Sequence, residues 1–312
     1  MIVTVTPNPS VDRTVHLPRV ERGAVIRATA ATAEAGGKGV NVARALSSQG
    51  IEALAVVPLA TESESSYGAL LRAAVPFVSV PVAGAVRVNV SLVEPDGTVT
   101  KVNEPGPDLT GEEVDGLLAC VEAEASGATW VVGCGSLPPG APADLYARLA
   151  RLRTAGRRVA VDASGEALRH TGPVDLLKPN RAELEELVGA DLTTLGAVVR
   201  AATHIVASGA GQAVLVSLGR DGALYVDADT ACHAEAPLDD VVNPVGAGDA
   251  LLAGYLAADV TTGGGPAALR TAVAWSVAAC RSAGTRMGQV GGRDLDAVVV
   301  HEPIDLDRVL AE

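Results

Sequence analysis

NPVGAGDALLAG, residues 243–254, is the stretch around which the rest of this chain is organised. Gly246, Ala247 and Gly248 form a turn, and an apolar helical pattern begins directly after Asp249. A turn that opens a helix offers free backbone N–H groups, so it can bind an anion. A carboxylate there repels a phosphate, but it is well placed to take a proton from a nucleophile that attacks a nearby phosphorus. Taken alone, the stretch is equally well explained as an ordinary helix start with an acidic first turn.

The composition permits a large aliphatic core and argues against polyanionic partners. Of the 312 residues, 48% are hydrophobic but only 2% are aromatic, so Ala, Val and Leu must fill the core. The formal net charge is −13 and no basic run occurs. We therefore expect neither nucleic acid nor an anionic membrane surface as a partner. An anionic substrate would have to be bound by a few individually placed Lys and Arg side chains.

The cysteines and the first residues predict a cytoplasmic protein. Cys120, Cys134, Cys232 and Cys280 are widely spaced and form no CxxC pair, as is typical of reduced thiols. The sequence opens with a β-branched run, so we expect no signal peptide. No run of about 18 consecutive apolar residues suggests a membrane span.

Short apolar strands alternate with helical patterns over most of the chain. The predicted strands are 2–6, 53–58, 129–132, 158–162, 176–178 and 213–218, and a hairpin is expected around 223–236. The predicted helices are 67–74, 111–126, 142–155, 181–188, 194–208, 247–257, 266–283 and 305–311. Such repeated strand–helix pairs predict an α/β fold, with a parallel sheet covered by helices on both faces.

A second, smaller sheet is expected beside this core. Residues 86–103 alternate apolar and polar residues and turn at Pro95-Asp96-Gly97, which predicts a hairpin. Residues 13–34 also lack a helical period, and we place them in the same sheet as a lid. The predicted division is therefore a core of 1–12, 35–85 and 104–312 and a lid of 13–34 and 86–103.

Two stretches offer cationic side chains for an anionic ligand. Residues 36–39, Gly-Gly-Lys-Gly, run into a helix that carries Asn41 in its first turn; they do not form a Walker A motif. The two glycines let the backbone approach a ligand closely, and Lys38 adds one charge. Arg87 and Asn89 share one face of the predicted hairpin. A structural turn and a solvent-exposed arginine remain open as plainer explanations.

Three further stretches carry polar groups at strand ends. Asn180 and Glu183 stand three apart across a helix start, where their oxygens suit Mg²⁺. The same spacing matches a capping box, which is the better explanation from spacing alone. Ser136 follows the strand at 129–132, and residues 217–222 form a glycine turn that either holds a nucleotide or begins a hairpin. Nearly all these stretches fall at the carboxyl ends of strands, where open α/β sheets bind ligands.

Six motifs then occur in an order that is typical of one family. They are Asn8-Pro9-Ser10-Val11-Asp12, residues 35–41, residues 135–140, Lys178-Pro179-Asn180 with Glu183, Ser217-Leu218-Gly219, and residues 245–249. On these motifs the chain resembles the PfkB (ribokinase-like) carbohydrate kinases over nearly its whole length. The resemblance implies a ribokinase-like three-layer α/β/α sandwich with a mainly parallel central sheet and a small β-sheet lid.

The resemblance implies a role for each matching residue on the sugar side. Asp249 would deprotonate the attacking hydroxyl, and the N–H groups of residues 246–248 would form the anion hole. Sugar hydroxyls would be bound by Asp12, Gly37 and Asn41. Lys38 and Arg87, with Ser136, would hold a phosphate that the sugar already carries.

On the nucleotide side the resemblance implies binding of ATP and Mg²⁺. The ATP site would include Lys178, Asn180, Ser217, Gly219 and Gly222, together with part of residues 272–284. Asn180 and Glu183 would organise Mg²⁺ and the nucleotide phosphates, mostly through water.

The implied reaction is the ATP-dependent phosphorylation of fructose 1-phosphate at its 6-hydroxyl, so the partners are ATP and a phosphorylated ketohexose. Tagatose 6-phosphate, another hexose phosphate, and a sugar-phosphate sensor without catalysis remain as alternatives. Asn243 stands where relatives with a monovalent-cation site commonly have an acidic residue, so no K⁺ requirement is implied. A homodimer through the lid is implied by analogy alone.

Overall fold

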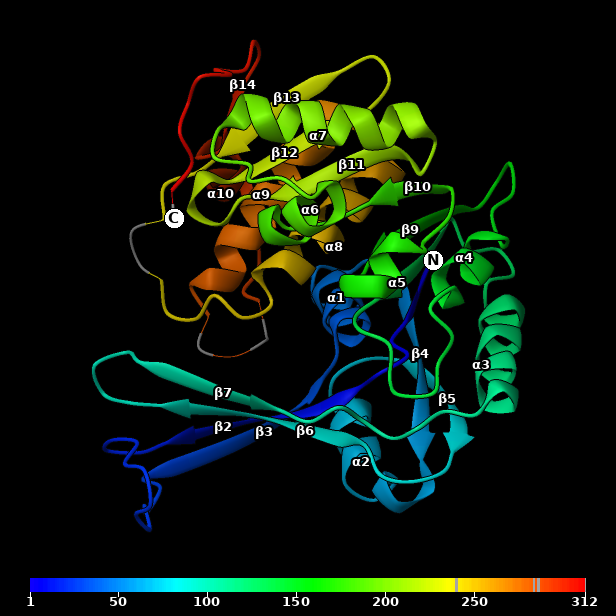
Figure 1. Ribbon diagram of the computed structural model, residues 1–312, viewed down its shortest axis with the longest axis vertical. Coiled ribbons are helices and arrows are strands. Elements are labelled where there is room, and N and C mark those ends of the chain that lie inside the picture. The colour runs from blue at the N-terminus through cyan, green and yellow to red at the C-terminus, as the bar shows by residue number, and fades with distance from the viewer. Residues whose placement is uncertain (239–240, 283, 285–286, 312) are drawn as a thin grey trace.

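A long, mainly parallel sheet forms the middle of the molecule in the computed structural model, which describes residues 1–238, 241–282, 284 and 287–311 (Figure 1). Across these residues the strand order is β14-β13-β12-β11-β10-β9-β8-β1-β4-β5. Strands β5 to β11 of this order pair in parallel, whereas β12, β13 and β14 continue the sheet antiparallel. The strands are β1 (Ile2–Val5), β4 (Ala53–Ala60), β5 (Phe77–Val82), β8 (Trp130–Cys134), β9 (Arg158–Asp162), β10 (Val174–Leu177), β11 (Gly211–Ser217), β12 (Ala223–Val226), β13 (Ala231–Glu235) and β14 (Val299–His301).

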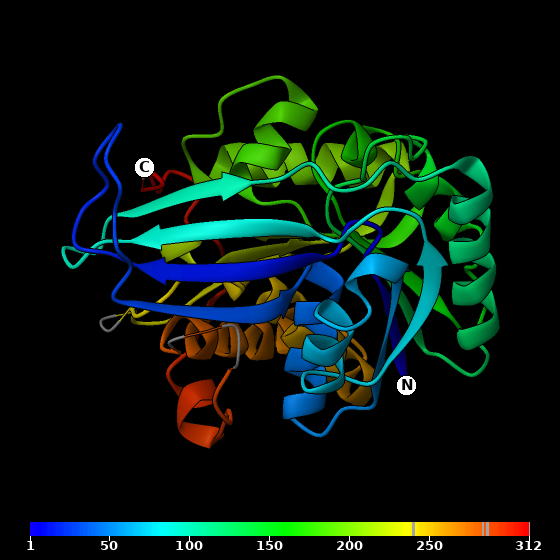
Figure 2. The same cartoon turned by 90° about the horizontal axis from the view of Figure 1, so that it is seen from below.

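Helices cover both faces of this sheet, as Figure 2 shows from below. One face carries α1 (Lys38–Ser48), α8 (Ala247–Thr262) and α9 (Gly265–Cys280), and the other carries α3 (Gly111–Glu124), α4 (Leu145–Ala150), α5 (Gly165–Arg169), α6 (Arg181–Val188) and α7 (Leu195–Ser208). The short helices α2 (Tyr67–Arg72) and α10 (Gly292–Asp296) and the 3₁₀ turns η1 (Thr61–Ser63) and η2 (Gly219–Asp221) complete the core. Every residue of β1 and β8 is buried, because helices exclude water on both sides of these strands.

Small side chains let α8 lie close against α9. A Cβ added to Gly254 would lie 2.9 Å from the Cα of Ala272, so a larger residue would push the two helices apart. This packing matters for the site because α8 begins with residues 247–249 of the opening stretch.

A separate four-stranded sheet extends sideways from the core (Figure 1). Its order is β3-β2-β6-β7, and it is formed by β2 (Ser10–His16), β3 (Ala30–Gly36), β6 (Arg87–Val93) and β7 (Val99–Asn103). The hairpin predicted within 86–103 is present as β6 and β7. The sheet begins at Ser10, so Asp12 lies in β2, where it pairs with Asn89 of β6.

The three-layer α/β fold and the small second sheet are as predicted, but several elements differ. The helix predicted at 305–311 is wrong, because the backbone there forms a turn and hydrogen bonds to residues 193–196. The helix predicted at 142–155 shrinks to α4. Strands β5 and β14 and helices α5 and α10 were not predicted. The helix predicted at 266–283 ends at Cys280, and residue 283 lies outside the described residues.

The helices that the structure describes are all too short, or not apolar enough along their length, to span a membrane.

Candidate active site

The turn before α8 has the geometry that its glycines predict. Gly246 adopts a φ of 84°, a conformation that side chains other than glycine rarely reach, and α8 starts at the next residue. Within the turn the N–H of Ala247 donates to the carbonyl of Pro244 at 3.3 Å, and Asn243 Oδ1 accepts a hydrogen bond from the N–H of Val245 at 3.0 Å. Asn243 therefore shapes the turn that leads into the helix.

Asp249 is a buried carboxylate on the first turn of α8, with 8% of its surface exposed. Its Oδ2 accepts a hydrogen bond of 2.8 Å from Nδ2 of Asn41 on α1. Burial and the negative charge of Asp162 raise the pKa of Asp249 to about 6, against the opposing effects of Lys38, Asn41 and Lys178. A carboxylate whose pKa lies near neutrality is well matched to a proton acceptor.

A carboxylate that the sequence analysis did not single out lies at the centre of the site. Asp162 ends β9, is fully buried, and lies 2.6 Å from Nζ of Lys38 and 2.9 Å from Nζ of Lys178. Burial raises the pKa of Asp162, but the charges of Lys178 and Lys38 outweigh it and hold this pKa below its ordinary value. The available signal was a carboxylate at the carboxyl end of a buried strand, which many α/β strands share.

Lys38 is held among carboxylates. Its Nζ lies 3.6 Å from Oε1 of Glu183 as well as 2.6 Å from Asp162. Burial by itself lowers the pKa of Lys38, but the charges of the surrounding carboxylates raise it by a larger amount. The pKa therefore lies above its ordinary value, and the amino group stays charged. The structure thus gives Lys38 partners on the side of β9 and α6, apart from those of Arg87.

Asn180 and Glu183 form the capping box that their spacing allowed. The N–H of Glu183 donates to Asn180 Oδ1, and the N–H of Asn180 donates to Glu183 Oε2, both at 2.8 Å. Glu183 Oε1 stays outside this box and faces Lys38. Among the residues that the structure describes, no cluster of three or more His, Cys, Asp or Glu side chains could hold a metal on its own.

A cavity of about 580 Å³ joins the predicted nucleotide residues to the start of α8. Asn180, Ser217, Gly219 and Gly222 line it together with Gly248. The N–H of Ser217 donates to the carbonyl of Pro179 at 3.1 Å, so two of the sequence motifs lie side by side. The predicted segment 272–284 contributes Val273, Ser276, Val277 and Cys280 to the wall. The Lys178 side chain lies close to the start of α8, since a Cβ added to Gly248 would lie 3.6 Å from Nζ of Lys178.

The predicted sugar residues meet where the small sheet joins the core. Asp12 Oδ1 accepts hydrogen bonds from Ser10 Oγ at 2.7 Å and from Asn89 Nδ2 at 3.1 Å. A Cβ added to Gly36 would collide with the Asp12 carboxylate, which explains the first glycine of the Gly-Gly-Lys-Gly motif. Gly37 has a φ of 114° and caps α1, which carries Asn41.

Arg87 bridges the small sheet and the loop after β1. Its guanidinium donates to the carbonyl of Glu104 at 3.1 Å and to the carbonyl of Asn8 at 3.2 Å. The Asn8 amide donates to Ser136 Oγ at 3.4 Å, so Ser136 joins this group. Burial lowers the pKa of Arg87.

Three buried polar atoms in this region have no hydrogen-bond partner among the described residues. They are Asn8 Oδ1, Arg87 Nε and Asn89 Oδ1. Burying such atoms unpaired is costly, so their presence together at one junction indicates a place where a polar ligand completes the bonding.

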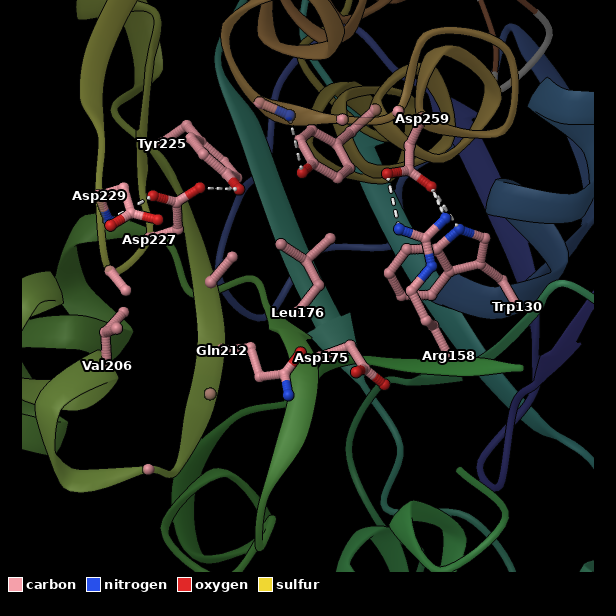
Figure 3. Close-up of a pocket in the computed structure, with 18 residues that line it drawn as sticks. Trp130, Arg158, Asp175, Leu176, Val206, Gln212, Tyr225, Asp227, Asp229 and Asp259 are labelled. Atoms are coloured by element: carbon pink, nitrogen blue, oxygen red, sulfur yellow. Dashed lines mark hydrogen bonds and ion pairs between the residues drawn. The ribbon is translucent and has the colours of Figure 1, made fainter. Parts of the chain in front are cut away.

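A second cavity, of about 530 Å³, lies at the amino ends of the parallel strands (Figure 3). It is lined by Trp130 and Arg158, which begin β8 and β9, and by Asp259 near the end of α8. Figure 3 shows the Asp259 carboxylate paired with the Arg158 guanidinium and with Trp130 Nε1. None of the predicted site residues lines this cavity.

A parallel α/β core, a helix that starts at a glycine turn and a buried carboxylate in its first turn form an arrangement that suits phosphoryl transfer without a Walker A loop. The sequence pattern of the pfkB family carbohydrate kinases matches residues 5–289, and the chain belongs to this family.

The relatives identify the chain as a phosphofructokinase-type sugar kinase. A 1-phosphofructokinase of Rhodobacter capsulatus is 41% identical over 262 residues, which cover 82% of each chain. A 1-phosphofructokinase of Haloferax volcanii is 37% identical and covers 97% of this chain and 96% of its own. Among solved structures, Escherichia coli phosphofructokinase-2 with substrates and products superimposes with a TM-score of 0.85 at 33% identity, covering 95% of this chain and 97% of that one.

Proposed function

We propose that this enzyme transfers the γ-phosphoryl group of ATP to the 6-hydroxyl of fructose 1-phosphate. The position of Asp249 carries the proposal. Its helix start, Ala247 and Gly248, lines the nucleotide cavity, while its carboxylate bonds to Asn41 beside the sugar residues. A base at the border of two ligand regions can deprotonate a hydroxyl of one ligand as it attacks the phosphorus of the other. The similarity to enzymes called 1-phosphofructokinase supports fructose 1-phosphate as the acceptor.

In this proposal Asp249 accepts the proton of the sugar hydroxyl. Its Oδ2 is oriented by Asn41. The backbone N–H groups of residues 246–248 stabilise the charge that develops on the transferred phosphoryl group. The N–H of Ala247 must first give up its 3.3 Å bond to Pro244 to take part.

We assign Lys38 to the transferred phosphoryl group and Arg87 to the phosphate that the sugar already carries. Lys38 lies with Asp162 and with Glu183, whose capping-box partner Asn180 lines the proposed nucleotide cavity. Arg87 lies at the junction with the small sheet, and its buried Nε, a donor, has no partner among the described residues, as a phosphate oxygen would provide. The sequence alone placed both cations on the same phosphate, and their separate partners support two distinct tasks.

Mg²⁺ fits the nucleotide side of the site. Glu183 keeps Oε1 outside its capping box, and Asp162 adds a buried carboxylate nearby. Mg²⁺ prefers such hard oxygens and is usually held largely by phosphates and water. When bound, it would neutralise phosphate charge that a chain of net charge −13 otherwise repels.

The small sheet is proposed to act as a lid, with the division at 13–34 and 86–103, and as the surface through which two copies pair. Its outer strand β7 is exposed along its whole length and carries Val99 and Val102. One Escherichia coli relative was solved as a tetrameric form. A cytoplasmic location is proposed because all four cysteines are free thiols.

The reaction is tested by incubating the purified chain with MgATP and a panel of phosphosugars and measuring ADP release. Fructose 1-phosphate should give the highest kcat/KM. A higher value with tagatose 6-phosphate, which the motif at 243–246 equally favours, would transfer the assignment to that sugar. A thermal shift with phosphosugars but no ADP release would instead indicate a sensor.

The proposed roles of Lys38 and Arg87 are distinguished by the substitutions Lys38→Met and Arg87→Met. Lys38→Met should lower kcat by about 10²-fold or more, because a charge at the transferred group is lost. Arg87→Met should raise the KM for fructose 1-phosphate by about tenfold or more while leaving the KM for ATP unchanged, since it removes a charge-assisted bond. Equal effects of both changes on the sugar KM would return Lys38 to the sugar phosphate.

A further inference from the structure

Residues 305–311, which we call the strap, follow an unexpected course. Instead of forming a helix, they lie against the start of α7. The N–H of Leu195 donates to the carbonyl of Arg308 at 3.0 Å, the N–H of Gly196 donates to that of Leu306 at 2.9 Å, and the N–H of Leu310 donates to that of Thr193 at 2.9 Å. A Cβ added to Gly196 would lie 2.7 Å from the Leu306 oxygen, so the close approach needs a glycine there.

Arg308 anchors the strap to two carboxylates on other elements. Its guanidinium donates to both oxygens of Glu235 on β13, at 2.8 and 2.7 Å, and to Asp221 Oδ1 in η2 at 3.2 Å. The bonds from Arg308, above all, lower the pKa of Glu235 to about 2. Asp221 is largely buried, so one guanidinium bonds to two carboxylates, of which one has little access to water, and offsets part of their combined charge.

The end of the strap reaches the nucleotide cavity itself. The N–H of Ala311 donates to Asp221 Oδ2 at 2.7 Å, and its carbonyl accepts a hydrogen bond of 2.8 Å from Arg181. Arg181 begins α6 directly after Asn180, and Asp221 lies between the cavity residues Gly219 and Gly222. Ala311 and Arg181 also line the cavity. The strap therefore ties together the two turns that frame this wall.

We propose that the strap is a positioning element for the nucleotide, with Arg308 as its key residue. The inference rests on the proposed function, which places the nucleotide in this cavity. Arg308 touches neither substrate nor reacting atoms; it acts by holding η2 and the start of α6 in place and by offsetting part of the negative charge of Asp221 and Glu235. Without it, the net negative charge beside the cavity would be larger and would repel the phosphates of the nucleotide more strongly.

The test is Arg308→Met, which keeps an apolar stem of similar length and removes the guanidinium. We expect the KM for ATP to rise by about fivefold or more, with the KM for fructose 1-phosphate and the kcat at saturating ATP nearly unchanged. Arg308→Lys should recover part of the affinity, because it restores the charge but cannot reach both carboxylates with a planar fork.

Arg148→Met is the matched control. Arg148 is exposed to nearly the same degree as Arg308, 29% against 30% of the side chain, and also pairs with a carboxylate, but it lies on α4 and contacts Asp115 of α3. It should change neither KM. If Arg308→Met does not fold, Arg308→Lys alone decides the question by the same ratio of KM values.

Two results would overturn the inference: equal rises of both KM values, or a lowered Tm with an unchanged KM for ATP. The unmodified enzyme is measured first. If it releases no ADP with any phosphosugar, the proposed function fails, whereas an active enzyme that tolerates Arg308→Met refutes only the role of the strap.

Discussion

At the scale of single residues, the site contains two carboxylates whose pKa values are shifted in opposite directions by burial and by neighbouring charges. The pKa of Asp162 is lowered by two lysines, whereas that of Asp249 is raised by burial and by Asp162 itself. One carboxylate therefore stays charged to hold cations, while the other can take up a proton near neutral pH.

The first prediction concerns Asp249→Asn. Loss of the base should lower kcat by about 10²- to 10⁴-fold with little change in either KM. The fold raises the pKa of Asp249 from 3.8 to about 6, so the folded state favours the neutral carboxyl and the charged carboxylate destabilises it. The neutral amide should therefore stabilise the protein at pH 7, by up to about 3 kcal/mol. Urea unfolding at pH 7 and stopped assays check both parts; a less stable variant with wild-type kcat would contradict them.

The second prediction is the pH dependence of the wild-type enzyme. Because Asp249 must be ionised to act as a base, kcat/KM should rise with pH through an apparent pKa near 6, the value for the enzyme without ligands. The stability contributed by this group runs the other way, falling as pH rises from 3.8 towards 6 and staying low above it. The stability gain of Asp249→Asn should thus disappear near pH 4. An activity profile that is flat from pH 5 to 8 is the outcome that this assignment does not allow.

At the scale of elements, α8 and β9 each run from one end of the parallel strands to the other. β9 carries Arg158 at its start and Asp162 at its end, while α8 carries Asp249 at its start and Asp259 near its end. The pair of Asp259 with Arg158 and Trp130 therefore joins the two elements at the end far from the site (Figure 3).

The third prediction follows from the burial of this pair. Asp259 is 2% exposed and Arg158 41% exposed, and the guanidinium also lies 4.3 Å from the Trp130 ring centre. Arg158→Ala should cost about 2–3 kcal/mol of stability, because among the side chains that the structure describes it leaves the buried carboxylate bonded to Trp130 alone. Urea denaturation measures the change. The double variant with Asp259→Asn should cost less than the two single changes added, and strict additivity would show that the pair is not coupled.

The control for this prediction is Arg148→Ala. Its partner Asp115 is 67% exposed, so water replaces the lost contact. We expect a cost below about 1 kcal/mol.

At the scale of the whole molecule, the two sheets differ in how far they are exposed to solvent. The large sheet is buried between helices, whereas the small sheet leaves β7 exposed at its edge. An exposed edge strand with apolar side chains favours pairing with another chain.

The fourth prediction is that the enzyme is a dimer and that Val102→Lys makes it a monomer. Val102 is 55% exposed on β7, and two lysines facing each other across a paired edge would repel. Sedimentation velocity at micromolar concentration measures the mass. A wild-type monomer, or a lysine variant that stays dimeric, would rule out pairing through this strand.

Much of the fold could be predicted from local patterns. Continuous apolar strands followed by helical periods indicate a parallel sheet with two helical layers, and Pro95-Asp96-Gly97 indicates the hairpin of β6 and β7. The strap shows where this reasoning stops. Leu306, Val309 and Leu310 have helical spacing, but a short helix is marginal by itself, and the bonds offered by residues 193–196 outweigh it.

The candidate site divides in the same way. Glycine turns at strand ends are local features, because positive φ angles and close approach require glycine whatever lies around them, as at Gly37 and Gly246. The sequence by itself therefore determined the order of the turns, the helix that carries Asp249 in its first turn, and the family to which the chain belongs. Only the tertiary structure decided that Asp162 lies between Lys38 and Lys178, and that Ala311 at the end of the strap lines the cavity beside Asn180. Lys38 and Asp162 stand 124 positions apart, and the course of the strap depends on hydrogen bonds to residues 193–196, so no local pattern records either arrangement.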